Sequence, residues 1–317
     1  MRSWKSVVVA HVLVLGLLAC VQKREPQRRG EAKAEAEQPR ARSLAAIDWK
    51  AVDRRLGKPG TLQPDGAYKV GLPRTDLRVT LGGVVLKPTL ALGSWVAFKQ
   101  ASDSEALLLG DLVLLEREVA PVVRKLQGTG IEQTALHNHL LQESPQIIYL
   151  HISGLGAPAR LAAAVHTALA ASRTPFGSPA TATTSRFGLD TTRIAQVLGF
   201  HGRVNGGVYQ VSAPRAETIT VEGFDAPPSM GLATAINFQP TAGGKAATTG
   251  DFVLLGSEVN PVVRALREHG IAVTAMHSHM LTDSPHLFFV HFWATGNAIT
   301  LARGLRAALD RTNVSRS

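Results

Sequence analysis

The chain has 317 residues, of which 45% are hydrophobic, and it carries a formal net charge of +10 at pH 7. This length suffices for two domains of ordinary size, and the apolar residues can supply a sizeable core. Much of the positive charge lies in the N-terminal segment and not on one helix or beside stacking aromatic residues, which argues against a nucleic-acid-binding protein. An anionic membrane surface is another partner that such a charge suits.

The first 20 residues have the features of a secretion signal. A basic start is followed by an apolar run over 7–19, which is too short to span a bilayer comfortably. Leu17-Leu18-Ala19-Cys20 then resembles the lipobox of bacterial lipoproteins, in which the cysteine is lipidated and becomes the mature N-terminus. Residues 1–19 are therefore expected to be a lipoprotein signal peptide, and Cys20 is expected to anchor the protein to membrane lipid in the bacterial cell envelope. An ordinary signal peptide with an incidental cysteine is the alternative.

The segment after Cys20 is rich in charged residues and contains almost no large apolar ones. Such a composition cannot bury enough surface to fold, so residues 20–43 are expected to form a disordered tether. We expect a first domain over 44–173, a linker rich in Ser, Thr, Pro and Gly over 174–190, and a second domain over 191–317.

Each expected domain begins with a helical pattern that a glycine ends, Gly57 in the first and Gly199 in the second. Runs typical of strands follow in both. The predicted helices cover 44–56 and 191–198, and the predicted strands cover 76–86, 92–99, 219–222 and 233–238.

The later part of each domain is a repeat. Residues 110–169 align without a gap with residues 250–309 at a constant offset of 140, and about 27 of the 60 aligned positions are identical. Each copy reads as a short apolar strand, a helix with an i, i+3, i+4, i+7 stripe, two strands joined by a tight turn, and a closing helix.

In the first copy the strands are predicted at 111–115, 131–141 and 146–153. The helix between the first two is predicted to have Pro121 in its first turn, where a missing N–H costs little. This β-α-β-β-α order predicts an α+β fold of two tandem homologous repeats, each an antiparallel sheet with helices on one face, in a ferredoxin-like variant. The two repeats are expected to pair within the chain.

Each copy also retains three histidines and a carboxylate. Because side chains alternate across a strand, His137 and His139 are predicted to point to the same face. The next strand is expected to run antiparallel and to bring His151 roughly opposite His137, with Cβ atoms about 5 Å apart. Glu143 in the turn can add an oxygen ligand. The second copy has His277, His279, Asp283 and His291 at these positions.

This residue set predicts a site for zinc or another transition metal, since imidazoles and a carboxylate around an open position are typical of zinc and non-haem iron sites. The expected metal ligands are His137, His139, Glu143, His151, His277, His279, Asp283 and His291. A small polar ligand bound without metal is a second interpretation. A third is a non-catalytic envelope interaction protein whose histidines hold the interface between the repeats. The sequence leaves open whether there are two sites or one composite site, and whether the protein is an enzyme; for an enzyme, metal-assisted hydrolysis is the expected class.

Four other carboxylates occur at equivalent positions of the two copies. Glu118 and Glu258 begin helices, where negative charge interacts favourably with the helix dipole, and a structural role is expected. An acid or base near the histidines is the alternative for these two. Asp111 and Asp251 follow glycines at predicted strand starts, so we interpret them as turn residues.

Several segments resemble the LppY/LpqO family of bacterial lipoproteins. They are Trp95-Val96-Ala97-Phe98, Gly110-Asp111-Leu112-Val113-Leu114, Thr134-Ala135-Leu136-His137-Asn138-His139, Pro228-Ser229-Met230-Gly231, Ala235-Ile236-Asn237-Phe238-Gln239-Pro240, Gly250-Asp251-Phe252 and Glu258-Val259-Asn260-Pro261. The resemblance extends over about residues 47–313 and agrees with the lipobox. It implies an envelope lipoprotein of uncharacterised function and assigns no catalytic residues.

Overall fold

The computed structural model describes residues 44–177 and 187–315. The expected signal peptide, Cys20 and the tether lie outside the described residues, as does the middle of the expected linker. Among the helices described, none is long and apolar enough to cross a membrane.

The first repeat contains four helices and eight strands in the described part of the chain. In order they are α1 (Trp49–Leu56), β1 (Thr61–Leu62), β2 (Tyr68–Pro73), β3 (Thr80–Leu81), β4 (Val84–Val85), α2 (Pro88–Ala91), β5 (Gly93–Gln100), β6 (Ala106–Leu115), α3 (Glu116–Leu126), β7 (Ile131–His137), β8 (Ile147–Gly156) and α4 (Pro158–Leu169).

The second repeat follows the same plan. Its elements are α5 (Thr191–Leu198), β9 (Gly202–Asn205), β10 (Val208–Pro214), β11 (Thr220–Val221), β12 (Phe224–Asp225), η1 (Pro228–Met230), β13 (Ala233–Pro240), η2 (Ala242–Gly244), β14 (Ala246–Leu255), α6 (Gly256–Glu268), β15 (Ala272–His277), β16 (Asp283–Ser284), β17 (Leu287–Gly296) and α7 (Ala298–Leu309).

Each repeat is built on a six-stranded antiparallel sheet, with the orders β1-β2-β5-β6-β8-β7 and β15-β17-β14-β13-β10-β9. In the first sheet β8 lies between β6 and β7 and is antiparallel to both, so the helix α3 crosses over β8. This split β-α-β unit is typical of ferredoxin-like folds. The predicted α+β fold of two homologous repeats is confirmed.

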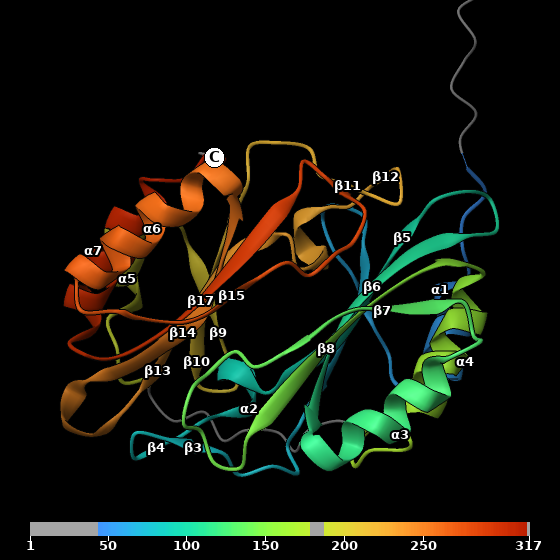
Figure 1. Cartoon of the computed structure of the whole chain (residues 1–317), viewed down its shortest axis with the longest axis horizontal. Helices are drawn as coiled ribbons and strands as arrows, with labels where there is room; N and C mark the ends of the chain where they lie inside the picture. The colour runs from blue at the N-terminus through green and yellow to red at the C-terminus, as the bar shows by residue number, and fades with distance from the viewer. Residues whose placement is uncertain (1–43, 178–186, 316–317) are drawn as a thin grey trace, which may run out of the picture. The chain divides into compact units, whose positions relative to one another are not determined.

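Helices cover one face of each sheet, and the opposite faces of the two sheets lie toward each other (Figure 1). The buried residues divide accordingly, because one cluster in each repeat lies between the sheet and its own helices. Two further clusters mix the repeats: Leu107 and Leu109 pack with Phe289, and Tyr149 packs with Val208. Strand β6 is buried along its whole length because it contributes side chains to both kinds of cluster.

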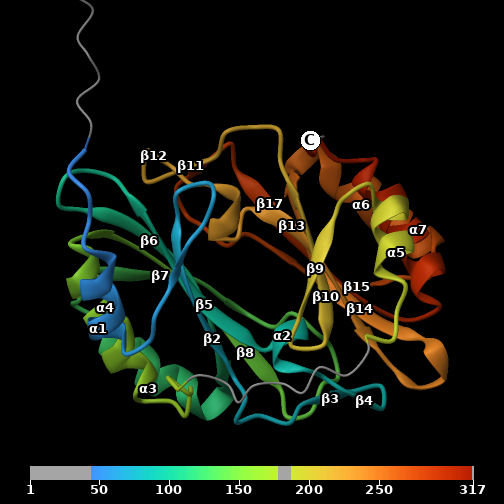
Figure 2. The same cartoon turned by 180° about the vertical axis from the view of Figure 1, so that it is seen from behind.

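Hydrogen bonds reinforce the contact between the repeats. The side chain of Gln239 accepts from the backbone N–H of Lys87 at 2.8 Å and donates to the carbonyl of Val85 at 2.8 Å. Asp65 accepts from the hydroxyl of Ser229 at 2.8 Å. Segments of the first repeat around α2 therefore lie against the second repeat, as Figure 2 shows from behind. Residues Leu44–Ser317 form one compact unit.

Several predicted boundaries differ from the structure. Helix α1 begins at Trp49, after Asp48 accepts a bond from the backbone N–H of Ala51, and not at residue 44. Of the strand predicted over 76–86, only the short hairpin of β3 and β4 forms. Helix α3 begins at Glu116, so Pro121 lies inside the helix and not in its first turn. The reason is that Glu118 caps the helix earlier, by accepting the N–H of Leu115 at 2.9 Å.

Candidate metal centre

The histidines lie where the sheets face each other, but not all of them lie on strands. His137 is the last residue of β7, and His139 lies two residues beyond its end. His151 on β8 is opposite Ala135, while His137 is opposite Tyr149, and a bulge between Gln133 and Ala135 shifts the register by one residue. The predictions that the strand extends to 141 and that His151 faces His137 were therefore wrong by a few residues.

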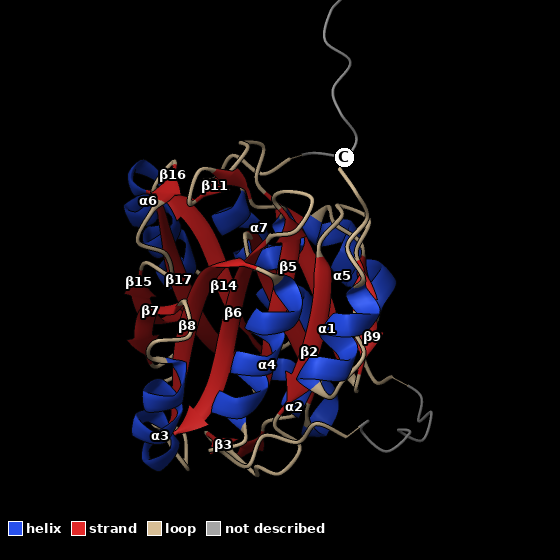
Figure 3. Ribbon diagram, turned by 90° about the vertical axis from the view of Figure 1, so that its right-hand side faces the viewer, coloured by secondary structure: helices blue, strands red, loops and turns tan. Residues whose placement is uncertain are grey.

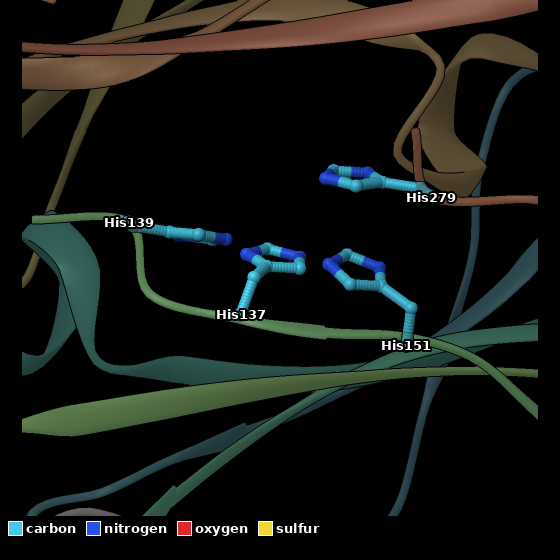
Figure 4. Close-up of side chains that lie close together, drawn as sticks. All are labelled: His137, His139, His151 and His279. Carbon is cyan, nitrogen blue, oxygen red and sulfur yellow. The ribbon is translucent and has the colours of Figure 1, made fainter. Parts of the chain in front are cut away.

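The six histidines meet in one cluster and not in two separate sites. Those of the first repeat form a row, with ring centroids 5.0 Å apart for His139 and His137 and 4.9 Å apart for His137 and His151. His291, His277 and His279 form an equivalent row with spacings of 4.9 Å. Figure 4 shows the first row lying edge to edge, with His279 of the other repeat stacked over His151.

The two rows are stacked face to face. The centroid separations are 3.8 Å for His139 with His291, 3.5 Å for His137 with His277, and 3.7 Å for His151 with His279. An aromatic ring closes each end of the array, since Tyr149 stacks on His139 at 3.4 Å and Phe289 stacks on His279 at 3.5 Å. Both repeats therefore contribute equally to a single site.

Figure 3 shows the two sheets from the side at which strands β7 and β15 lie. Strands β7 and β15 are the edges of their sheets and lie near each other. The hydroxyl of Thr274 on β15 donates to the backbone carbonyl of His139 at 2.6 Å, which fixes the loop after β7 to the second repeat.

The ring nitrogens of the cluster are buried without partners among the described residues. The Nε2 atoms of all six histidines make no hydrogen bond, and neither do the Nδ1 atoms of His137 and His277. Only the Nδ1 atom of His291 has a partner in the cluster, the carbonyl of Gly250 at 3.2 Å, to which it donates. Buried polar atoms without partners are destabilising, so this array is suited to binding something that the nitrogens can coordinate.

Burial keeps the imidazoles neutral. It lowers the pKa of His137 to about 3 and that of His277 to about 4, and neighbouring histidines add to the effect at His137. Burial and the mutual proximity of the rings hold the pKa values of His139, His151, His279 and His291 well below the usual range. At pH 7 the six rings are therefore in the neutral form that binds metals.

Three combinations of these side chains place one ligand atom of each residue within 4.8 Å of the others. The first comprises His137, His139, His277 and His291, and the second comprises His137, His139, His151 and His279. The third adds a carboxylate to two imidazoles and comprises Asp251, His279 and His291. All six predicted histidines thus lie close enough to share metal ions.

The two turn carboxylates do not belong to these groups. Glu143 accepts from the backbone N–H of Ile147 at 3.1 Å, and burial raises its pKa to about 7. Asp283 accepts from the N–H of Leu287 at 2.6 Å and from His286 at 2.9 Å. Both side chains are therefore held within their own turns, and the structure does not support their predicted role as ligands.

Asp111 and Asp251 are the acidic residues beside the histidines, and the sequence interpretation of these two as turn residues was wrong. They lie within the long strands β6 and β14, directly opposite His151 and His291. Asp111 Oδ1 is 3.8 Å from His151 Nε2. Burial raises the pKa of Asp111 far above its usual range and that of Asp251 to about 7. A Gly-Asp pair occurs in both copies, followed by an apolar run. This pattern could have indicated that the two aspartates lie within strands.

A half-buried lysine that the sequence analysis did not identify lies near these carboxylates. Lys69 on β2 donates to the carbonyl of Ser229 at 2.7 Å and lies 4.2 Å from the centroid of the Trp95 ring. Burial lowers its pKa to about 8, against the opposing effect of Asp111 and Asp251. The second repeat has Gln210 at the equivalent place in its sheet, so this positive charge occurs on one side only.

Glu118 and Glu258 are structural, as expected. Glu118 pairs with the fully buried Arg74 at 2.8 Å and caps α3, and Glu258 does the same with Arg215 at 2.7 Å in the second repeat. Neither carboxylate is part of the groups around the histidines.

Comparison with known proteins gives a family but no function. A sequence model described as Domain of Unknown Function (DUF1259) matches residues 50–171 and 192–311. No curated protein matches the sequence. A trimeric bacterial microcompartment shell protein, PduB, is 13% identical over 80% of this chain and 91% of its own, with a TM-score of 0.22. EtuB from Clostridium kluyveri is 10% identical over 79% and 90%, with a TM-score of 0.18. These scores are too low to support an argument about function.

Proposed function

The chain belongs to the family described as Domain of Unknown Function (DUF1259), and we propose that it binds a transition metal in the histidine cluster between its two repeats. The observation that carries this proposal is the set of buried ring nitrogens without partners, contributed by six neutral imidazoles that face one another. Neutral imidazole is a preferred ligand of zinc, copper, nickel and iron.

The alternatives fit this cluster less well. A structural cluster would be expected to satisfy its nitrogens with hydrogen bonds, since an unpaired buried polar group costs about 1–3 kcal/mol. A small organic ligand needs more room than the cavity of about 20 Å³ bordered by His151 and His279, which holds about one water molecule. An ion needs no larger space.

Metal analysis of the purified protein tests the proposal. We expect stoichiometric zinc, copper, nickel or iron in the wild-type protein, and loss of that metal in a His137→Ala/His277→Ala double variant. His137 belongs to both four-histidine groups, and His277 belongs to one of them and stacks on His137. A metal-free protein should gain about 2.7 kcal/mol of stability when the metal is added at 100 times its dissociation constant.

A His201→Ala variant is the matched control. His201 is exposed outside the helices and strands, so its removal should leave metal content and the metal-induced stabilisation unchanged. If the wild-type protein purifies without metal and its melting temperature does not respond to any of these ions, the proposal is wrong and the histidines hold the interface only.

We also propose that the protein is a lipoprotein of the LppY/LpqO type, anchored in the bacterial cell envelope through Cys20. Support comes from the lipobox and from the segments quoted above, which extend through both repeats. A Cys20→Ala variant should then move from the membrane fraction to the soluble fraction after cell lysis. Retention of this variant in the membrane would contradict anchoring through the lipid.

A further inference from the structure

The central histidines of the two rows differ from the other four in one respect. His137 and His277 each have both ring nitrogens buried and without partners, whereas the outer histidines have only Nε2 in this state. In Figure 4 His137 lies between His139 and His151, so its two ring edges face different neighbours. One central ring can therefore offer a nitrogen to each half of the array.

The repeat offset relates the two halves. A shift of 140 converts His139 into His279 and His151 into His291. The stacked pair His139–His291 is thereby exchanged with the stacked pair His279–His151, and the observed separations of 3.8 and 3.7 Å agree with this equivalence. The central pair His137–His277 is converted into itself. The array thus has two equivalent halves on either side of a shared centre.

The unpaired nitrogens divide evenly between the halves. Each outer pair offers two Nε2 atoms, and the two central rings together offer four further nitrogens. A single tetrahedral ion would use four nitrogens and leave the others buried without partners. Two ions can together be coordinated by nitrogens from all six rings.

We propose that the cluster is a two-ion centre, in which one transition-metal ion binds the His139–His291 pair, a second binds the His151–His279 pair, and His137 and His277 lie between them. This inference rests on the proposed metal-binding function. The group of His137, His139, His277 and His291 describes one half. The other group of four contains the outer pair of the other half, His151 and His279, together with His137 and with His139 of the first half.

Two carboxylates offset the charge of two ions in a buried site. Asp111 Oδ1 lies 3.8 Å from His151 Nε2, and Asp251 is grouped with His279 and His291, which are one histidine from each outer pair. A central ring that serves both ions loses its N–H proton to solvent as an imidazolate, which adds negative charge between the two ions. One nitrogen–metal bond would use the electron pair left by the lost proton, and the other would use the lone pair already present on the second nitrogen, so no oxidant or reductant is needed.

Cobalt(II) titration of the metal-free, full-length protein tests the proposal, followed by gel filtration and elemental analysis. We expect two cobalt ions per chain in the wild-type protein. His139→Leu and His279→Leu each remove a ligand from one half, so each variant should retain one ion, and the double variant should retain none. Because leucine has about the volume of imidazole and no ligand atom, the cavity stays filled. His201→Leu, which alters an exposed side chain, should still bind two.

The stacking partners provide a second test of each half. His291→Leu should match His139→Leu, and His151→Leu should match His279→Leu, so a variant that fails to fold does not prevent the test. One cobalt ion in the wild-type protein, or loss of both ions in each single variant, would overturn the two-ion centre while leaving metal binding intact. No cobalt bound at all would overturn the proposed function itself.

Discussion

At the scale of single residues, the unusual property of this protein is a set of six histidines whose buried Nε2 atoms have no partner among the described residues. Stacking alone does not explain their placement, because apolar rings would stack equally well without unpaired nitrogens. Neutral imidazoles that are already oriented toward one another lose little entropy on metal binding. We therefore regard the neutral state of these rings and their unpaired Nε2 atoms as preparation for a ligand.

The same histidines predict that the metal-free protein loses stability in mild acid. Each ring has a lowered pKa in the folded state, about 3 for His137 and about 4 for His277, and returns to about 6.5 on unfolding. Between these values the unfolded chain binds more protons than the folded one. The stability is therefore full above pH 6.5 and falls as the pH decreases.

Three buried carboxyl groups act in the opposite direction. Asp251 and Glu143 have pKa values raised to about 7, and that of Asp111 is raised further, so the folded state binds their protons first. These three carboxyl groups offset the effect of about half of the six histidines on the number of bound protons. The remaining difference corresponds to a loss of up to about 4 kcal/mol in the free energy of unfolding per pH unit. Urea unfolding with a chelator present, at pH 7 and at pH 5, measures this loss. The dependence should weaken in a His151→Leu/His279→Leu variant, and equal stability at the two pH values would contradict the prediction.

At the scale of elements, each repeat depends on a buried arginine that joins the sheet to a helix. Arg74 is fully buried after β2; it donates to the carbonyl of Val113 on β6 at 2.8 Å and pairs with Asp76 and Glu118 at 2.8 Å each. Since Glu118 also caps α3, one guanidinium fixes the start of the helix that follows the site strand β6. Arg215 has the same contacts in the second repeat.

Arg74→Met should therefore destabilise the protein by about 3–5 kcal/mol, because it leaves the buried carboxylate of Glu118 without its partner. Arg54→Met is the matched control: its ion pair with Asp48 is exposed, and its loss should cost less than about 1 kcal/mol. Chemical denaturation of the two variants measures the difference. The interpretation would be wrong if both variants unfolded at the same denaturant concentration.

At the scale of the whole described molecule, the site exists only because two repeats meet. The inner faces of the sheets bury apolar residues from both repeats, including Leu107, Val253 and Phe289. The histidines lie within this shared core, which explains their low exposure. A duplicated chain can thus form one histidine cluster from two equivalent sets of three, one from each repeat.

Much of the fold could be predicted from the sequence because it depends on local patterns. The helix over 191–198 and the strand beginning at Ala233 have the predicted starts, since capping residues and alternating apolar residues act over short distances. The ends of β7 and α3 could not be predicted as reliably. Strand β7 ends before His139, whose carbonyl accepts a long-range bond from Thr274. Glu118, which caps the start of α3, is held by Arg74 from a distant part of the chain.

The sequence by itself determined that the chain is duplicated, that each copy is an α+β unit, and which six histidines belong together, because these features are recorded in composition, periodicity and a constant offset. Only the tertiary structure decided that they form one composite site, that Asp111 and Asp251 lie beside it, and that Glu143 and Asp283 do not. The physical reason is that the site lies between two sheets, and the register of facing sheets depends on packing between residues that are far apart in the chain.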